Sequence, residues 1–413
     1  MQVSLGLRIL SALIAGFVLG AWCSGSTGAA AQVLAAIEPI GHLWLNALRM
    51  TVLPLVFALL VTGVGAVRGQ ASGAPVAARS MAWFVAALSA SALAGALLTP
   101  FMLKVFPVDA AAASALRAGA SHAASQVGSP PPLSEWVLGL ITANPFEAAA
   151  KGDVLQIVMF ALLFGLAAAR VAPTYRESLL GFFQGVVEVM LVIVHWVLRV
   201  APLGVFALAA ALGRRGGFGA AGALGYYLAL TCAASCFIVL VCYPLVRCLG
   251  GIAMTRFARA VLPSQILAFS TQSSLACLTA MIEAARDALR LPQQIFSVTL
   301  PMAVSLFRCT SPIVNLSVVL FVAHVTGTSI GLAPLLAGVC MAVVTNFAVV
   351  GLPSQITFFT TTVPISYAMG VPTDILPLLL AIEVIPDLFR TVGNVTADLA
   401  VTTIVAKGAR VDR

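Results

Sequence analysis

The chain has 413 residues, of which 61% are hydrophobic and only 9% are charged, and its mean hydropathy is +1.06. A soluble domain carries about a quarter of its residues as charged side chains, so this composition excludes one and predicts a protein whose solvent is lipid. The net charge of +8 would suggest a nucleic-acid partner in a soluble protein, but in a membrane protein lysines and arginines gather in cytoplasmic loops. We therefore expect a lipid bilayer, and no nucleic acid, as the chain's surroundings.

Apolar runs that approach the roughly 20 residues of a membrane-spanning helix recur along the chain. They cover 9–23, 51–67, 81–103, 154–169, 178–211, 221–246, 293–326, 330–350 and 374–405. Some are too long and others too broken to be single spans, which indicates interrupted helices that face protein or a wet cavity. Basic residues such as Arg8 and Lys407 predict that both termini are cytoplasmic, in a bacterial-type inner membrane.

The only long polar stretch runs from about Pro107 to Ser134 and is rich in Ala, Ser, Gly and Pro. This composition predicts a flexible external loop. Since no other polar stretch could hold a soluble domain, we expect a single membrane domain over 1–413.

Two segments carry polar residues between apolar stretches that are each too short to cross the bilayer. The first, 255–290, has the run STQSS at its centre, and the second, 330–370, has Gly351 and Pro353 near its centre. Each pattern predicts a re-entrant helical hairpin.

Polar residues recur every three or four positions along the last apolar run, so Asp387, Arg390, Asn394 and Asp398 share one helix face. Ionisable side chains at mid-membrane cost roughly 2.5–3.5 kcal/mol each, and they usually face a wet cavity or one another. The planar guanidinium of Arg390 suits a carboxylate. We hypothesise a site for a small carboxylate, with a purely structural Asp387–Arg390 ion pair as the alternative.

The same run resembles a family signature. Residues 387–398, DLFRTVGNVTAD, look like the D-x-x-R-T-x-x-N-V-x-x-D motif of the dicarboxylate/amino acid:cation symporters, the glutamate transporter family. Further similar stretches are 50–57, 144–147, 154–156, 201–206 and 299–301, so that the resemblance covers nearly the whole chain. It implies an all-α polytopic membrane protein with eight transmembrane helices and two re-entrant hairpins, which transports a small dicarboxylate or acidic amino acid as a cation-coupled symporter.

The resemblance also implies a division of labour and a homotrimer. A fixed scaffold part would cover about 1–78 and 130–215, and a mobile transport part about 79–106 and 220–407. Both hairpins would belong to the transport part, which carries the substrate past the scaffold.

The resemblance, together with the chemistry of the side chains, also suggests roles for single residues. Arg390 would hold the side-chain carboxylate of the substrate, Asp387 its amino group, and Glu383 would be a proton carrier or a structural partner. The candidate substrate residues are Ser273, Ser274, Arg308, Asp387, Arg390, Thr391 and Asn394, and the candidate sodium ligands are Asn394 and Asp398. For Ser273 and Ser274, capping of short half-helices is an equally good interpretation.

One stretch departs from the family pattern. Its N-M-D-G-T sodium motif aligns with Phe307–Ser311, where the acidic residue is missing and Arg308 is gained. A fixed guanidinium repels a nearby cation, so we expect weakened or absent sodium coupling, with proton coupling or exchange in its place. Alternatively, Arg308 pairs with Asp387 or Asp398 beside a remodelled sodium site, or it binds a second carboxylate of a substrate such as succinate or malate.

Other functions are less well supported by the residues. No nucleophile with a base and no cofactor loop is apparent, and the four histidines are scattered, so we expect neither an enzyme nor an organic cofactor. The coupling ion is sodium or a proton. The competing function is a non-transporting membrane sensor or scaffold of the same family, which the broken sodium motif permits and the polar face of the last span disfavours.

Overall fold

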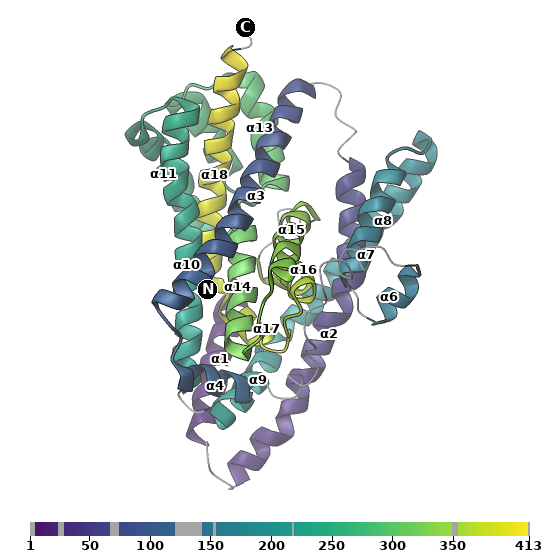
Figure 1. The fold of residues 1–413 in the computed structure, drawn as a ribbon, viewed down its shortest axis with the longest axis vertical. Coiled ribbons are helices and arrows are strands. Elements are labelled where there is room, and N and C mark those ends of the chain that lie inside the picture. The colour runs from purple at the N-terminus through teal and green to yellow at the C-terminus, as the bar shows by residue number, and fades with distance from the viewer. Residues whose placement is uncertain are drawn as a thin grey trace.

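The computed structural model describes residues 5–23, 29–66, 74–119, 143–151, 154–216, 219–348 and 354–411. Every element in these ranges is helical, which confirms the all-α prediction for this part of the chain (Figure 1). The α-helices are α1 (Leu5–Trp22), α2 (Ala29–Ala66), α3 (Ala74–Val105), α4 (Ala110–Gly119), α6 (Pro145–Lys151), α7 (Val154–Ala168), α8 (Pro173–Arg199), α9 (Ala201–Gly216), α10 (Gly219–Leu245), α11 (Met254–Thr271), α12 (Leu278–Glu283), α13 (Gln293–Leu306), α14 (Thr310–Thr326), α15 (Leu332–Ala348), α16 (Ser354–Met369), α17 (Leu376–Ile382) and α18 (Val384–Val411). Two π-helical turns, η2 (Val246–Gly250) and η3 (Ala284–Ala288), continue α10 and α12.

Four helical stretches in the described ranges are long and apolar enough to cross a membrane. They are Pro75–Val105, Pro173–Val197, Ala221–Gly250 and Gln293–Thr326. Shorter apolar helices accompany them, among them Ser11–Trp22. The helices support a multi-pass membrane protein, while the arrangement of eight spans and two hairpins stays a prediction.

Part of the expected external loop is helical. The segment Ala110–Gly119 forms α4, which packs against α9 and α10. Alanine is the best helix former, and burial of Ala112, Ala113 and Leu116 adds a core contact that a flexible loop lacks. The prediction of a flexible loop was therefore wrong for 110–119, and 120–142 lie outside the described residues.

The two predicted hairpin segments each contain two helices. In the first, Gln272 follows the last residue of α11 and has a positive φ of 54°, which reverses the chain, and α12 begins after the turn 273–277. In the second, α15 packs against α16, and the expected tip at 349–353 lies outside the described residues. That each pair of helices enters the membrane without crossing it stays a prediction.

The helices pack in two groups. In one, α2 contacts α7, α8 and α9, and α9 also contacts α1; in the other, α14 and α18 form the centre and contact α3 and α10. Figure 1 separates α8 and α7 from α10 and α11 on opposite sides of the molecule. The predicted site residues all lie in the second group, at the meeting of α18 with α11, α13 and α14.

Candidate substrate site

The polar face of α18 is buried in the protein. Asp387, Arg390, Asn394 and Asp398 have exposed fractions of 3%, 4%, 5% and 0%. The neighbouring Thr391 is also buried, and its hydroxyl donates to the Asp387 carbonyl of its own helix at 2.9 Å. Helical spacing predicted that these residues share a face, and the packing of α18 shields that face from the outside.

Arg390 lies between two partners. Its Nη1 donates to Asn315 Oδ1 of α14 at 3.1 Å, and its Nη2 lies 2.8 Å from Glu383 Oε1. The Nη2 contact is off the line of the N–H bond, so it is an ion pair without a formed hydrogen bond. Glu383, which is fully buried, therefore acts as a partner of Arg390 in this structure.

One edge of the Arg390 guanidinium keeps its hydrogen-bonding capacity. Within the described ranges, Nε and Nη2 donate no hydrogen bond to a protein acceptor. These two groups form one side of the guanidinium fork, which binds both oxygens of a carboxylate at once. The chemistry needed to bind a carboxylate is thus present on this edge.

Tyr227 of α10 completes the chain of contacts on Glu383. Its hydroxyl donates to Glu383 Oε2 at 2.6 Å, and Tyr227 itself is fully buried. Sequence analysis assigned no role to Tyr227 or Asn315. Both lie on other helices, where no spacing rule connects them with α18.

Asn394 holds the beginning of α14. The Thr310 backbone N–H and hydroxyl both approach Asn394 Oδ1, at 3.0 and 2.8 Å, after the break that 307–309 make between α13 and α14. The hydrogen bond satisfies one of the N–H groups that a helix start leaves without a partner in its own helix. Gly393 permits the approach, because a methyl group there would collide with Thr310 Cγ2.

Arg308 lies in the break itself, partly buried. It is close enough to interact electrostatically with Asp387, Arg390 and Asp398. Asp398 is fully buried, and neither of its carboxylate oxygens accepts a hydrogen bond from a described residue. A positive charge near Asp398 offsets part of the cost of burying its carboxylate.

The turn after α11 lies beside the start of α18. Gln272 Nε2 donates to the Val384 carbonyl at 3.4 Å. Ser274 is buried, whereas Ser273 is half-buried and accepts a hydrogen bond from the Ala276 N–H at 3.3 Å. This hydrogen bond lies within the turn before α12, whose N-cap residue is Cys277 without a side-chain hydrogen bond, so both interpretations of Ser273 stay predictions.

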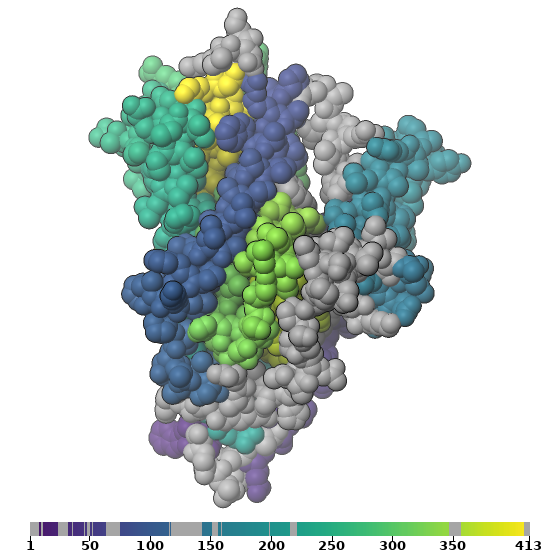
Figure 2. Space-filling model, viewed as in Figure 1, coloured from purple at the N-terminus to yellow at the C-terminus, as the bar shows by residue number. Residues whose placement is uncertain are grey.

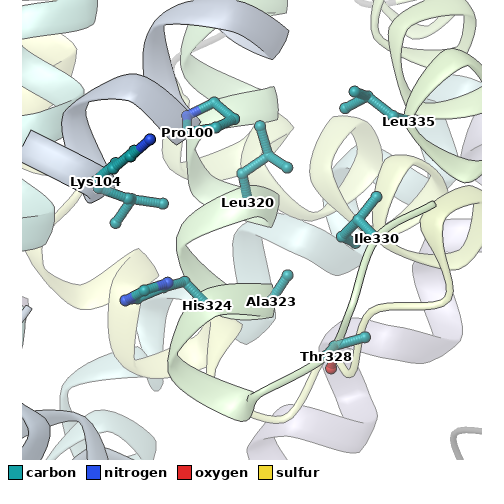
Figure 3. Close-up of a pocket in the computed structure, with 9 residues that line it drawn as sticks. Pro100, Lys104, Leu320, Ala323, His324, Thr328, Ile330 and Leu335 are labelled. Carbon is teal, nitrogen blue, oxygen red and sulfur yellow. The ribbon is translucent and has the colours of Figure 1, made fainter. Parts of the chain in front are cut away.

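A cavity of about 350 Å³ lies away from these residues, between α3, α14 and the start of α15 (Figure 3). Lys104 and His324 lie on one side of it and Ile330 and Leu335 on the other, with Leu320 between them. None of the predicted site residues lines it. It is therefore a separate feature of the molecule.

Comparisons with known proteins identify a family for the chain. The model of the sodium:dicarboxylate symporter family matches residues 5–408. The chain is 26% identical over 409 residues to the proton/glutamate-aspartate symporter of Escherichia coli, a match that covers 98% of this chain and 93% of the relative. It is 26% identical over 407 residues to the proton/sodium-glutamate symport protein of Bacillus subtilis, which covers 98% and 93% of the two chains.

A C4-dicarboxylate transport protein of Rhodospirillum rubrum is 24% identical over 406 residues, which covers 97% of this chain and 87% of the relative. All three relatives are transporters and none is an enzyme. Since the family match spans nearly the whole chain and its signature residues lie together on a buried helix face, this protein belongs to the sodium:dicarboxylate symporter family.

Proposed function

We propose that the protein is a secondary active symporter of a small dicarboxylate or acidic amino acid, located in the bacterial inner membrane with both termini in the cytoplasm. The Nε–Nη2 edge of Arg390 carries this proposal, because it is a buried binding group for a carboxylate whose one described polar neighbour is the ion-pair partner Glu383. The printed functions of the relatives support the same class of substrate, since they include glutamate, aspartate and C4-dicarboxylates.

The substrate is proposed to lie between α18 and the turn after α11. One carboxylate takes the Nε–Nη2 edge of Arg390. Thr391, Asn394 and the Ser273–Ser274 turn contribute further polar contacts. A substrate with an amino group places it on Asp387. A dicarboxylate without one places its second carboxylate toward Arg308, which is close enough to Asp387 and Arg390 to interact with both.

The Arg390–Glu383 pair suggests how a proton is coupled to binding. A substrate carboxylate on Nε and Nη2 competes with Glu383 for the same guanidinium, since Glu383 Oε1 already lies 2.8 Å from Nη2. Two carboxylates that share one buried cation repel each other, and a proton on one of them relieves the repulsion. Glu383 is the proposed proton carrier, and Tyr227 holds its carboxyl group in place from the other side.

Sodium coupling is proposed to be weak or absent. Arg308 brings a fixed positive charge close to Asp398, which with Asn394 was a candidate sodium ligand. In addition, Asn394 Oδ1 already accepts from Thr310. Both features lower the expected affinity of this region for a sodium ion.

The two packed groups of helices support the proposed division into scaffold and transport parts. The predicted scaffold ranges contain α1, α2 and α6 to α9, and the predicted transport ranges contain most of α3 and α10 to α18. The helix α4 lies in neither range and packs against α9 and α10. Most of the extensive helix contacts fall within one part or the other. Smaller contacts, such as those of α15 and α16 with α2, would form the surface along which the parts move.

Uptake by purified protein in proteoliposomes tests the proposal. Labelled aspartate, glutamate, succinate and malate are offered with a sodium gradient or a proton gradient imposed separately. We expect uptake with the proton gradient alone. Sodium-driven uptake would contradict the role given to Arg308, and binding without flux would favour the non-transporting sensor or scaffold.

A further inference from the structure

A second cavity, of about 200 Å³, lies between the end of η2, the start of α11, the residues that follow η3 and the last turns of α18. Its lining includes two basic side chains, Arg256 of α11 and Lys407 of α18. Figure 2 shows the end of α18 between α11 and α3 at this end of the molecule. None of the residues on the polar face of α18, which contains the proposed substrate site, lines this cavity.

Arg256 is fixed in its orientation. Its Nε and Nη2 both donate to the Ala288 carbonyl, at 3.1 and 2.9 Å, and Nη2 also approaches the Leu289 carbonyl at 3.4 Å. These bonds tie the start of α11 to the end of η3. Since carbonyl groups carry no net charge, the positive charge of Arg256 is oriented but not neutralised.

Lys407, which also lines the cavity, packs against a glycine. Gly251 ends the π-helical turn η2 with a φ of 72°, and the position of a Cβ atom there would lie 3.4 Å from Cδ, Cε and Nζ of Lys407. The lysine side chain therefore packs along the glycine backbone. In the part of the chain that the structure describes, no carboxylate lies within ion-pair distance of Lys407 or Arg256.

The surrounding charge is also positive. Arg247 and Arg259 lie on η2 and α11, close in sequence to the cavity lining. Of the two nearby acidic residues, Asp287 is bound by Arg286 through hydrogen bonds of 2.8 and 2.9 Å, and Glu283 is the other. Two fixed cations beside one small cavity repel each other, and an anion between them removes that repulsion.

We propose that this cavity binds the phosphate group of an anionic phospholipid from the cytoplasmic leaflet. Since a water molecule occupies about 30 Å³, the cavity holds the volume of about seven waters, which fits a phosphodiester group and is small for a nucleotide. Basic pockets between membrane helices on the cytoplasmic side bind lipid headgroups in this way. The leaflet rests on the proposed orientation of the termini, whereas the phosphate site does not.

Exposed apolar residues on the helices that lead to the cavity could contact the acyl chains of a lipid bound there. Leu245 and Leu249 are exposed at 40% each on α10 and η2, and Leu262 and Ile266 are exposed at 52% and 60% on α11. Each pair is four residues apart, so each forms a short apolar strip on its helix. A headgroup between Arg256 and Lys407 places its acyl chains along such strips and connects α11 with α18, the helix that carries the proposed substrate site.

Retention of lipid by the delipidated full-length protein tests the proposal. Phosphatidylglycerol and phosphatidylcholine with the same acyl chains are added, and the bound lipid is measured by native mass spectrometry. We expect phosphatidylglycerol to be retained preferentially, and the double variant Arg256→Gln/Lys407→Gln to bind it about tenfold more weakly or worse, since it loses two charged hydrogen-bond donors. Arg247→Gln/Arg259→Gln removes the same charge outside the cavity lining and should retain the lipid.

Three outcomes would overturn the proposal. They are equal retention of both lipids, an equal loss in the two double variants, and displacement of phosphatidylglycerol by inorganic phosphate at millimolar concentration, which would assign the cavity to a soluble anion. Arg256→Lys with Lys407→Arg keeps both charges, so its retention of lipid separates loss of the site from loss of the fold. The measurement needs no transport, and its failure would leave the proposed symport untouched.

Discussion

At the scale of single residues, the buried guanidinium of Arg390 is the ion-pair partner of Glu383 and also the proposed binding group for the substrate carboxylate. A buried ion pair compensates its desolvation only when both partners remain, and removal of one partner typically costs about 3–5 kcal/mol. When a substrate carboxylate binds Arg390, the negative charge of Glu383 must therefore be neutralised, because Glu383 has no surface exposed to solvent. Charge balance at this pair is the physical reason to expect proton coupling.

Glu383→Gln separates coupling from binding. Glutamine keeps the shape of the side chain and can still accept from Tyr227, but it carries no charge to neutralise. We expect proton-driven uptake to be lost while exchange of internal for external substrate continues, both measured in proteoliposomes. Glu188→Gln, which changes an exposed carboxylate on α8, should leave both activities intact. Full proton-driven uptake by Glu383→Gln would rule out the carrier role.

Substitutions in the break between α13 and α14 test whether sodium coupling can be restored. Arg308→Met with Cys309→Asp restores the methionine and the carboxylate of the family motif. We expect this variant to acquire sodium-stimulated uptake, because a fixed cation is removed and an oxygen ligand is added beside Asp398. The measurement is initial uptake with and without a sodium gradient at constant pH. A variant that binds substrate but stays indifferent to sodium would show that Arg308 does not replace the ion.

At the scale of elements, the contact between α14 and α18 positions residues of the candidate site. The start of α14 is held by Asn394, and the Thr310 methyl group of α14 packs directly against the backbone of Gly393. Any displacement of α14 would also move Asn315, which binds Arg390. The geometry of Arg390 thus depends on how closely two helices pack.

Gly393→Ala tests this dependence. The added methyl group collides with Thr310 Cγ2, and overpacking of this kind typically costs about 1–3 kcal/mol. We expect a lower thermal unfolding temperature in detergent together with weaker substrate binding. Gly185→Ala is the matched control, because a Cβ atom at that position on α8 has nothing within 4 Å. Equal behaviour of the two variants would contradict the proposed close contact.

At the scale of the whole molecule, an apolar stripe on α8 fits a subunit interface. Phe182, Val189 and Trp196 are exposed at 64%, 55% and 60% and follow one another at intervals of seven residues, so they lie on one side of the helix. α8 belongs to the proposed scaffold part. A homotrimer that buries this stripe would keep the scaffold fixed while the other group of helices moves.

Native mass spectrometry in detergent checks the oligomeric state. We expect the mass of three chains, and we expect Val189→Arg to release monomers because a buried unpaired charge is costly at an interface. Leu97→Arg introduces the same charge on α3 at an apolar residue that is 75% exposed and assigned to the transport part. It should leave the trimer intact. A monomeric parent protein, or equal dissociation of both variants, would contradict the proposed interface.

The sequence by itself determined the membrane character, the helical class and the polar face of α18. Hydropathy and spacing depend on the order of residues alone, so Asp387, Arg390, Asn394 and Asp398 could be assigned to one face without coordinates. The same information predicted that some of the apolar runs are interrupted, and the structure places one such break at 307–309, between α13 and α14. It failed at 110–119, where alanine-rich composition looked like a loop and burial against α9 and α10 favours a helix.

Only the tertiary structure decided which groups meet across helices. Helical periodicity relates residues of one element, whereas the contacts of Arg390 with Asn315, and of Glu383 with Tyr227, depend on the packing of α10 and α14 on α18. The cavity between Arg256 and Lys407 joins residues that are far apart in the chain for the same reason. The sequence thus supplies the charged groups of this transporter, and packing decides whether each one meets a partner, a proton or a ligand.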